Sequence, residues 1–369
     1  MPSSKKKSSS AKLIGMPWDF ASLWNEAIRS LPERPLQKRS HIWASELGGA
    51  YVDRYLKMHG HPFSNPINFR SKRKFTAGHI WEWIVGIVLT ATGIIKEQQL
   101  RGEVQLPKML KVTGRLDFIA GGDIDWVKAK EQVKVIQQIF ATSIDDMPPF
   151  IFHAVDRILF KMEQMFTRVP LQEVILECKS VGGIMAGRLE NATSAMPHHE
   201  LQNLHYLLAN KMPTGVVLYV SKDDAFCYQF EVTPTKELLK KYRDDVKTMT
   251  AYYNNSGKDY LKTLPPLEKE VSFNEVSFQF VKNFYVEYSN YITMLYGYKD
   301  FEAFKWKWQK PLASFNRVFK RCVKGDNMTA ANLDIIKEAK KTFPLWDKYV
   351  AKAKAAGAFQ KPEEEGEDE

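Results

Sequence analysis

A carboxylate and an ammonium group, Glu177 and Lys179, stand two positions apart at the end of the hydrophobic run 174–180. Side chains of a β-strand alternate between its two faces, so a strand here would place both groups on one face. Burying two charges is costly unless they pair or bind an ion, and a metal-dependent site for phosphate chemistry would explain both. An isolated E-x-K pattern more often ends a strand at the surface with solvated side chains. The choice between a surface pair and a metal-dependent site therefore depends on the other polar residues of the chain.

Two further acidic residues stand in apolar surroundings. Asp117 lies among the β-forming residues 112–120, which predict a strand, although a turn could also satisfy its carboxylate with backbone N–H groups. Glu82 lies in residues 76–92, which predict a buried helix. Most of this helix is apolar, and the residues that are not share one narrow face. They are His79, Glu82, Gly86 and Thr90. Glu82 is therefore expected to point into a polar cleft, or else to pair with a buried cation.

A second polar face is predicted on a helix that begins at Pro197, a residue favoured in the first helical turn. Leucines form the core stripe of this helix, while His198, Gln202 and Tyr206 recur at intervals of four residues on another face. Three hydrogen-bonding side chains in a line could hold a metal-bound water or a phosphate. The ordinary outer face of an amphipathic helix has the same pattern, so both interpretations stay open.

Two segments combine cations with aromatic residues. Residues 69–75 form a predicted loop that is either solvated or a phosphate-contacting edge. Its cations are Arg70, Lys72, Arg73 and Lys74. In residues 304–310, Trp306 and Trp308 alternate with lysines as in surfaces that bind single strands, although aromatic residues at helical spacing more often form a core.

The composition favours a polyanionic partner. Lys and Arg number 53 against 43 Asp and Glu, which gives a net charge of +10, and several of the acids are concentrated in residues 363–369. The three cysteines are far apart and form no disulfide or zinc pattern, as expected in a reducing cytoplasm. The most apolar window, residues 80–89, is shorter than the roughly 20 residues that span a bilayer, so no membrane association is expected.

The predicted elements divide the chain into regions of different character. Helices are predicted at 19–30 and 42–59, strands at 96–106 and 112–120, and a hairpin at 216–232. A helical insertion at 125–168 separates Asp117 from Glu177, and the chain is mostly helical beyond residue 235. We therefore expect a disordered basic tail (1–15), a main domain (16–235), a helical C-terminal extension (236–355) and a disordered acidic tail (356–369).

Four pieces of the sequence, taken in order, resemble the PD-(D/E)xK nuclease superfamily, in particular its RecB-type and phage lambda-type exonuclease branch. The pieces are Gly78-x-x-x-Glu82, Gly114-x-x-Asp117, Glu177-x-Lys179 and Gln202-x-x-x-Tyr206, on a helix, two strands and a helix. Leu116 replaces the proline of the nominal motif, and the insertion is long for the superfamily. The resemblance implies an α/β fold with a restriction-endonuclease-like core. A central mixed β-sheet would be flanked by helices, with a helical N-terminal cover, a helical insertion and a helical C-terminal extension.

The resemblance also implies a metal site. Asp117 and Glu177 would bind Mg²⁺ or Mn²⁺, joined by the main-chain carbonyl of Cys178 and, directly or through water, by Glu82. No iron–sulfur cluster is expected, because Ala50 stands where the iron–sulfur members of the RecB type place a cysteine.

The remaining residues of the motif would act on the reacting groups. Lys179 would position and help to deprotonate the attacking water or stabilise charge on the phosphate, while the metal lowers the pKa of the water. Gln202 and Tyr206 would orient Lys179, the water or the 5′ end. His198 extends the same face but matches no position of the family motif.

The activity implied by the resemblance is metal-dependent hydrolysis of DNA. An exonuclease acting on linear ends in phage or bacterial recombination or DNA processing is the first expectation, with a recombinase or replication partner and an oligomer as further possibilities. A structure-specific or nicking endonuclease with the same site is one alternative. The other is a catalytically inert nucleic-acid-binding or assembly protein on the same fold.

Overall fold

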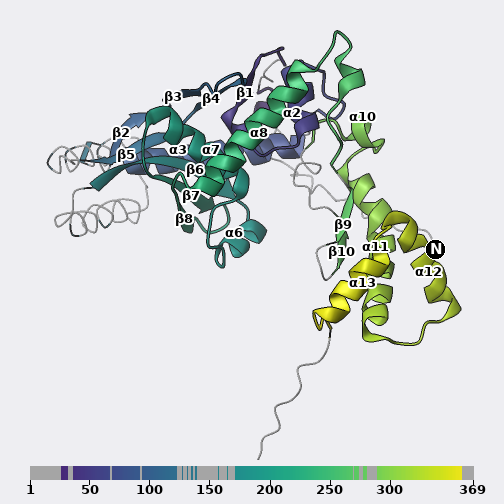
Figure 1. Cartoon of the computed structure of the whole chain (residues 1–369). Coiled ribbons are helices and arrows are strands. Elements are labelled where there is room, and N and C mark those ends of the chain that lie inside the picture. The colour runs from purple at the N-terminus through teal and green to yellow at the C-terminus, as the bar shows by residue number, and fades with distance from the viewer. Residues whose placement is uncertain are drawn as a thin grey trace, which may run out of the picture. The chain divides into compact units, whose positions relative to one another are not determined.

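A computed structural model describes residues 26–31, 36–66, 69–91, 94–122, 171–268, 270–273, 277–280 and 289–359, with isolated positions between 127 and 164. The predicted tail 1–15, most of the insertion 125–168 and the chain after residue 359 lie outside these residues. The chain forms two compact units, each assembled from segments distant in sequence (Figure 1). The first unit comprises Met1–Leu36, Ile67–Val104 and Thr113–Lys240, and the second comprises Gln37–Pro66, Gln105–Val112 and Lys241–Glu369.

The first unit is built on a five-stranded mixed sheet with the order β2-β5-β6-β7-β8. Its strands are β2 (Ile95–Gln98), β5 (Phe118–Gly122), β6 (Leu171–Val181), β7 (Gly215–Ser221) and β8 (Cys227–Val232). Strands β6 and β7 are parallel, and the other neighbours are antiparallel. A parallel pair needs a crossover, which contains helix α7 (Pro197–Asn210). The expectation of a mixed sheet flanked by helices is thus confirmed.

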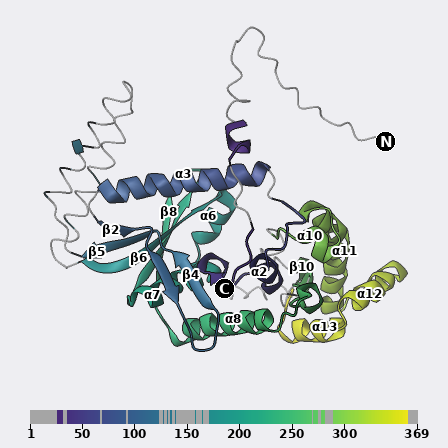
Figure 2. The same ribbon diagram turned by 90° about the horizontal axis from the view of Figure 1, so that it is seen from above.

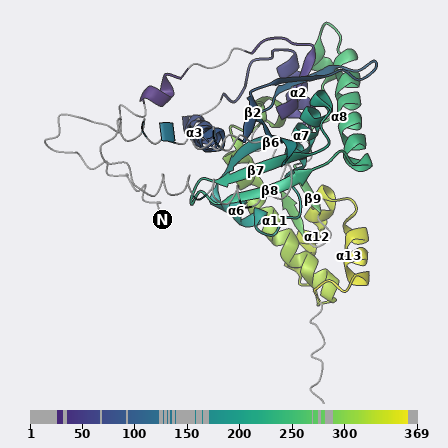
Figure 3. The same ribbon diagram turned by 90° about the vertical axis from the view of Figure 1, so that its left-hand side faces the viewer.

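Helices cover both faces of this sheet (Figure 2 and Figure 3). On one face, Val85 and Leu89 of α3 (Phe69–Ala91) pack against buried residues such as Phe118 and Cys178. Helix α7 contacts β6 and β7 and contributes the buried Leu204 and Leu207. Since successive residues of β6 face opposite sides, Cys178 points toward α3 while its neighbours on either side point toward α7.

Two glycines let α3 approach the sheet closely. A Cβ atom at Gly78 would lie 3.1 Å from Oγ of Ser180, and one at Gly86 would lie 3.0 Å from Cζ of Phe118. Glu82 is one helical turn from each glycine and therefore shares their face. The spacing of these three residues is explained by packing, and it directs the carboxylate of Glu82 toward the strands.

Strand β6 extends beyond its neighbour β5. The last pair between them joins Phe118 to Leu176, whereas the pairing of β6 with β7 continues to Val181. Asp117 therefore lies where β5 begins, not within a strand as predicted. The part of β6 that carries Glu177 has an edge without a partner from β5, and this edge is where the polar residues gather.

Several predicted elements have different limits in the structure. Residues 69–75 are the first turns of α3 instead of a loop, and this helix is less buried than predicted, since Trp83 is 68% exposed. The two predicted strands at 96–106 and 112–120 are each interrupted. They become β2, β3 (Arg101–Val104), β4 (Lys111–Arg115) and β5. The glycine-rich segment after β6, predicted as a loop, contains helix α6 (Gly183–Leu189).

The predicted helix 42–59 is wrong in its first half. Strand β1 (His41–Trp43) and the 3₁₀ turn Ala44–Glu46 precede α2 (Tyr51–Met58). Gly48 has a φ of 71°, a left-handed conformation that ends regular helix, and a Cβ at Gly49 would lie 2.9 Å from the carbonyl oxygen of Glu46. The glycine pair therefore separates the two elements. Of the predicted helix 19–30, residues 26–29 are described and helical.

The second unit is mainly helical around an aromatic core. Its elements include β9 (Val271–Phe273), β10 (Phe278–Phe280), α10 (Ile292–Tyr296), α11 (Phe301–Lys324), α12 (Ala330–Thr342) and α13 (Trp346–Ala355). Helix α8 (Lys236–Asn254) runs across the division between the units. Phe278, Phe319 and Trp346 are at most 1% exposed and contact one another at the centre of this core. No helix in the described ranges is long and apolar enough to cross a membrane.

Candidate functional site

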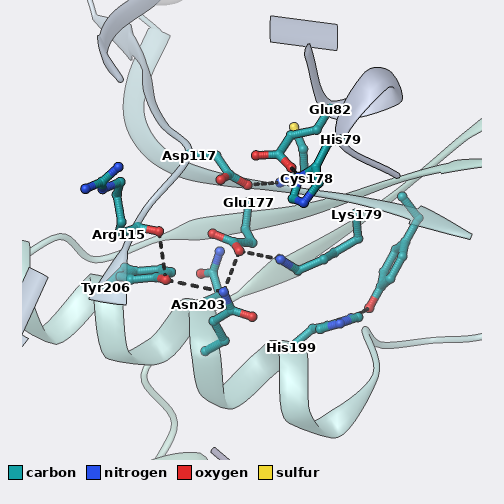
Figure 4. Close-up of polar contacts among 12 residues, drawn as sticks. His79, Glu82, Arg115, Asp117, Glu177, Cys178, Lys179, His199, Asn203 and Tyr206 are labelled. Atoms are coloured by element: carbon teal, nitrogen blue, oxygen red, sulfur yellow. Dashed lines mark hydrogen bonds and ion pairs between the residues drawn. The ribbon is translucent and has the colours of Figure 1, made fainter. Parts of the chain in front are cut away.

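Glu177 and Lys179 form a close ion pair on β6. Nζ of Lys179 lies 2.5 Å from Oε1 of Glu177, as expected for two side chains on one face of a strand (Figure 4). Glu177 is only 1% exposed, whereas the Lys179 side chain keeps 24% of its surface accessible. The carboxylate is therefore fixed inside the protein, whereas part of the Lys179 side chain reaches the surface.

The polar face of α7 points at this pair. Nε2 of Gln202 donates to Oε1 of Glu177 at 2.6 Å and lies 3.3 Å from the hydroxyl of Tyr206. That hydroxyl donates to the main-chain carbonyl of Arg115 at 2.9 Å. Gln202 and Tyr206 are both buried, so this is not the solvated outer face of an amphipathic helix. The network fixes the orientation of Glu177.

His198 lies at the beginning of the same helix. Burial, together with the positive charge of Lys179, lowers the pKa of His198 to about 4. The imidazole is therefore neutral at physiological pH. It can donate one hydrogen bond and accept another, but it adds no positive charge.

Asp117 is a second buried carboxylate beside the pair. It is 6% exposed, and its Oδ2 accepts a hydrogen bond of 2.8 Å from the main-chain N–H of Cys178. Burial, and then the charge of Glu177, raise the pKa of Asp117 well above its ordinary value. Burial also raises the pKa of Glu177, although Lys179 opposes this shift. Two buried carboxylates, one on β6 and one just before β5, thus raise each other's cost of ionisation, and a cation between them would offset it.

Glu82 approaches the same region from α3 (Figure 4). Its negative charge contributes to the raised pKa values of Asp117 and Glu177, which places it within electrostatic reach of both. The Glu82 side chain is 34% exposed, and its Oε2 lies 3.5 Å from Nδ1 of the exposed His79. Glu82 is therefore partly exposed and close to the two buried carboxylates, and the polar cleft stays a prediction.

The carboxylates around Glu177 provide some, but not all, of the oxygen ligands that a hard divalent cation needs. Oε2 of Glu177 is buried and has no hydrogen-bond partner within the described residues, so one carboxylate oxygen is left unsatisfied, and a bound cation would satisfy it. Three carboxylates, those of Glu82, Asp117 and Glu177, face one ammonium group, and a divalent cation would balance the excess. Across the ranges that the structure describes, no group of three or more His, Cys, Asp or Glu side chains is close enough to hold a metal. A cation would therefore need the Asp117–Glu177 pair with main-chain or water oxygens.

The side chain of Cys178 does not take part. Its thiol belongs to the apolar cluster between α3 and the sheet, and burial raises the pKa of the thiol above its usual range. A neutral, buried thiol is not a metal ligand. Only the main chain of Cys178 is available to the site, as the sequence resemblance implies.

Three parts of the site have no signal in the sequence. The carbonyl of Arg115 is a main-chain acceptor. Lys222, in the turn between β7 and β8, donates to the carbonyl of Lys74 at 3.1 Å and lies near the close contact of Gly78 with Ser180.

The hydroxyl of Tyr219 lies 2.8 Å from Nδ1 of His199 and accepts from the N–H of Met196 at 3.0 Å, which fixes the beginning of α7.

The predicted phosphate-contacting residues begin α3. The guanidinium of Arg73 lies over the ring of Phe69 at 4.8 Å, and that of Arg29 lies at 4.8 Å from the same ring. Lys72 is partly buried and Lys74 is exposed. The side chain of Arg70 lies outside the described part. The contact between Lys74 and Lys222 ties this basic segment to the end of the sheet that carries Lys179.

The two predicted tryptophans belong to the second unit and differ in environment. Trp306 is 68% exposed. Trp308 packs against the aromatic core, and its Nε1 donates to Oε2 of Glu270 at 2.7 Å. The position of Trp308 favours a structural role, and only Trp306 presents its ring to solvent.

Comparisons with known proteins add little to this geometry. No protein-family model matches the chain, and no curated protein matches it. Among solved structures, the chain is similar to one described as "Crystal structure of SSO0001", with 12% identity over 68% of this chain and 98% of that chain. The TM-score of 0.37 is too low to carry an argument about a shared fold or activity.

Proposed function

We propose that the chain is a metal-dependent nuclease that hydrolyses phosphodiester bonds of DNA. The observation that carries the proposal is the open Oε2 of Glu177, a buried carboxylate oxygen beside the buried Asp117 and the ion-paired Lys179. A structural ion pair gains nothing from an open oxygen, whereas a ligand-binding carboxylate requires one. The order of the motif pieces on helix, strand, strand and helix, as in the PD-(D/E)xK superfamily, supports the same proposal.

Asp117, Glu177 and the main-chain carbonyl of Cys178 would hold the cation, and Glu82 would act through a water. When bound, Mg²⁺ or Mn²⁺ would lower the pKa of a coordinated water and offset charge on the leaving oxygen. The ligands are held in advance, because Gln202 fixes Glu177 and the N–H of Cys178 fixes Asp117.

Lys179 would act as a cationic donor. Burial alone would lower its pKa, but the charges of Glu177 and Asp117 raise the pKa above its usual range. The amino group therefore keeps its proton at neutral pH, and it can donate to a phosphate oxygen or orient the attacking water. Between the roles suggested by the sequence, this favours stabilisation of charge over removal of a proton.

The choice of DNA as substrate rests on the resemblance and on charge. The net charge of +10 favours a polyanion. The basic beginning of α3, with Arg73 and Lys74, adjoins the end of the sheet through Lys222. An exonuclease that acts on linear ends in phage or bacterial recombination or DNA processing is the form of the activity that the resemblance favours.

Cleavage of three DNA substrates tests the proposal. End-labelled linear duplex, linear single strand and closed circular duplex are incubated with Mg²⁺, Mn²⁺ or EDTA, using the wild type and Lys179→Ala purified in the same way. We expect metal-dependent loss of the linear substrates alone, abolished by Lys179→Ala. Cleavage of the circle would indicate the endonuclease alternative. No cleavage of any substrate with either metal would contradict the proposal and favour a binding protein.

A further inference from the structure

Helix α11 of the second unit carries its charges on one side. Its 24 residues include seven Lys or Arg and a single acid, Glu302. The exposed residues Trp306, Lys310, Ala313, Arg317, Lys320 and Lys324 recur at alternating intervals of four and three positions. Such intervals follow the helical repeat of 3.6, so these residues form one stripe. We call the set Lys310, Arg317, Lys320 and Lys324 the α11 cation stripe.

The opposite side of α11 fixes the direction in which the stripe faces. Leu312, Phe315, Phe319 and Val323 are buried in the aromatic core with residues of β10 and α13. Rotation of the helix would remove these side chains from the core, so the stripe must stay at the surface. The cations extend over about 21 Å, from the helical rise of about 1.5 Å per residue.

Neighbouring helix α12 shows the ordinary arrangement of surface charge. It carries three lysines and two acids. Lys341 lies 3.4 Å from Glu338, and Lys340 lies 2.8 Å from Asp347 of α13. In contrast, no ion pair between described residues includes a member of the α11 cation stripe. Four like charges in line repel one another, an arrangement that lowers stability unless an anion binds them.

We propose that the α11 cation stripe binds the phosphate backbone of duplex DNA. The proposal rests on the proposed function only in taking DNA as the partner. Each of its four cations can neutralise one phosphate, so the stripe would make about four phosphate contacts. Trp306 lies in line with the stripe at its N-terminal end and is 68% exposed, where an indole can stack on an unpaired base.

Salt dependence of binding by the full chain tests this surface. Fluorescence anisotropy with a labelled linear duplex in EDTA measures affinity without cleavage. The variant Lys310→Gln/Arg317→Gln/Lys320→Gln/Lys324→Gln should reduce the slope of log K against log salt by about 3 to 4, at about 0.9 per phosphate contact. A matched variant removes the same charge elsewhere in the second unit, at Lys262, Lys337, Lys341 and Lys348. It should leave the slope nearly unchanged.

Three outcomes would overturn the inference. They are an unchanged slope in the stripe variant, an equal loss in the matched variant, and no binding of duplex by the wild type. The stripe variant should unfold at or slightly above the wild-type midpoint, because its removed charges repel one another. The matched variant should unfold close to the wild-type midpoint, because its replaced side chains are exposed. Trp306→Ala should weaken binding to a duplex with a single-stranded overhang and leave the slope intact, since stacking releases no counterions.

Failure of the nuclease proposal would be seen separately. If the chain binds duplex through the stripe but cleaves no DNA, the inference stands and the nuclease proposal falls. If the stripe variant binds as the wild type does while linear DNA is still cleaved, the nuclease proposal stands and the stripe has no role in binding.

Discussion

The two units each contain a buried ion pair, and the pairs differ in how completely they are satisfied. In the second unit, Arg54 donates to both oxygens of Asp245 at 2.7 Å, with the guanidinium 2% and the carboxylate 9% exposed. In the first unit, Lys179 and Gln202 both contact Oε1 of Glu177, and Oε2 has no hydrogen-bond partner within the described chain. Both oxygens of Asp245 are therefore bonded, although Nε of Arg54 has no hydrogen-bond partner among the described residues, whereas one carboxylate oxygen of Glu177 is left without a partner.

The two pairs also differ in the balance of charge around them. Arg54 faces a single carboxylate and also lies over the ring of Tyr51 at 4.7 Å. Lys179 faces Glu177 with the buried Asp117 beside it, so negative charge is in excess. A balanced pair with bidentate geometry serves stability, whereas an unbalanced pair with an open oxygen is arranged for a ligand.

The largest effect on stability is expected at Arg54. Arg54→Ala leaves the buried Asp245 without its partner, which should lower the free energy of unfolding by about 3–5 kcal/mol. Urea denaturation followed by circular dichroism measures the change. The double variant Arg54→Met/Asp245→Leu should recover much of the loss, because no charge is left buried. A single variant as stable as the wild type would show that the pair is not structural.

The largest effect on activity is expected at Lys179. Lys179→Ala should reduce kcat by about 10²–10³-fold, the usual cost of removing one preorganised donor to developing charge. Lys179→Ala also leaves the buried Glu177 without its cation, so stability in EDTA should fall as well, and kcat is compared at a temperature where the variant is fully folded. Single-turnover cleavage of linear duplex is the measurement. Unchanged kcat, or a loss explained entirely by unfolding, would make the Glu177–Lys179 pair structural like the other.

Metal binding should distinguish the pairs without any activity. Mn²⁺ at about 100 times its dissociation constant should stabilise the wild type by about 2.7 kcal/mol, because it binds only the folded chain. Asp117→Asn should remove this stabilisation, whereas Asp245→Asn should lower stability in EDTA but keep the response to Mn²⁺. Differential scanning fluorimetry with and without EDTA measures both. An equal Mn²⁺ response in wild type and Asp117→Asn would exclude Asp117 from the metal site.

The elements nearest the site were largely predictable from the sequence because their signals are local. A hydrophobic run predicts β6, Pro197 predicts the beginning of α7, and turn residues predict the hairpin of β7 and β8. The pairing of Glu177 with Lys179, and of Gln202 with Tyr206, followed from the periods of strand and helix. That the two pairs would meet in one site was implied by the family resemblance alone. Residue spacing within single elements was therefore sufficient to predict which side chains of β6 and of α7 share a face.

The errors have non-local or ambiguous causes. Residues 69–75 were predicted as a loop from their charge, yet Lys and Arg are good helix formers and simply extend α3. Leu116 and Asp117 lie between β4 and β5, where they bond to Leu100 and Gln99, and Gln99 interrupts the opposite chain with a left-handed φ of 54° that has no sequence signal. The division into two units joins residues 37–66 with 241–369, and no linker composition marks such a division.

The smallest predicted effect concerns the support of Glu177 by α7. Tyr206→Phe removes the hydrogen bond from the hydroxyl to the carbonyl of Arg115, which should cost about 1 kcal/mol of stability. It also frees Gln202 to rotate, so kcat on linear duplex should fall by about tenfold, as for a group that orients a metal ligand. Gln202→Leu should lower kcat further, because it leaves Oε1 of Glu177 with Lys179 alone.

Rescue experiments sharpen this last contrast between support and catalysis. If Tyr206 acts only by holding Glu177, higher Mn²⁺ should restore much of the kcat of Tyr206→Phe and none of that of Lys179→Ala. A weaker ligand geometry is overcome by mass action, whereas a missing donor is not. Full recovery of both variants would mean that Lys179 also acts through metal binding. Recovery of neither would place the Tyr206 hydroxyl in contact with the reacting groups.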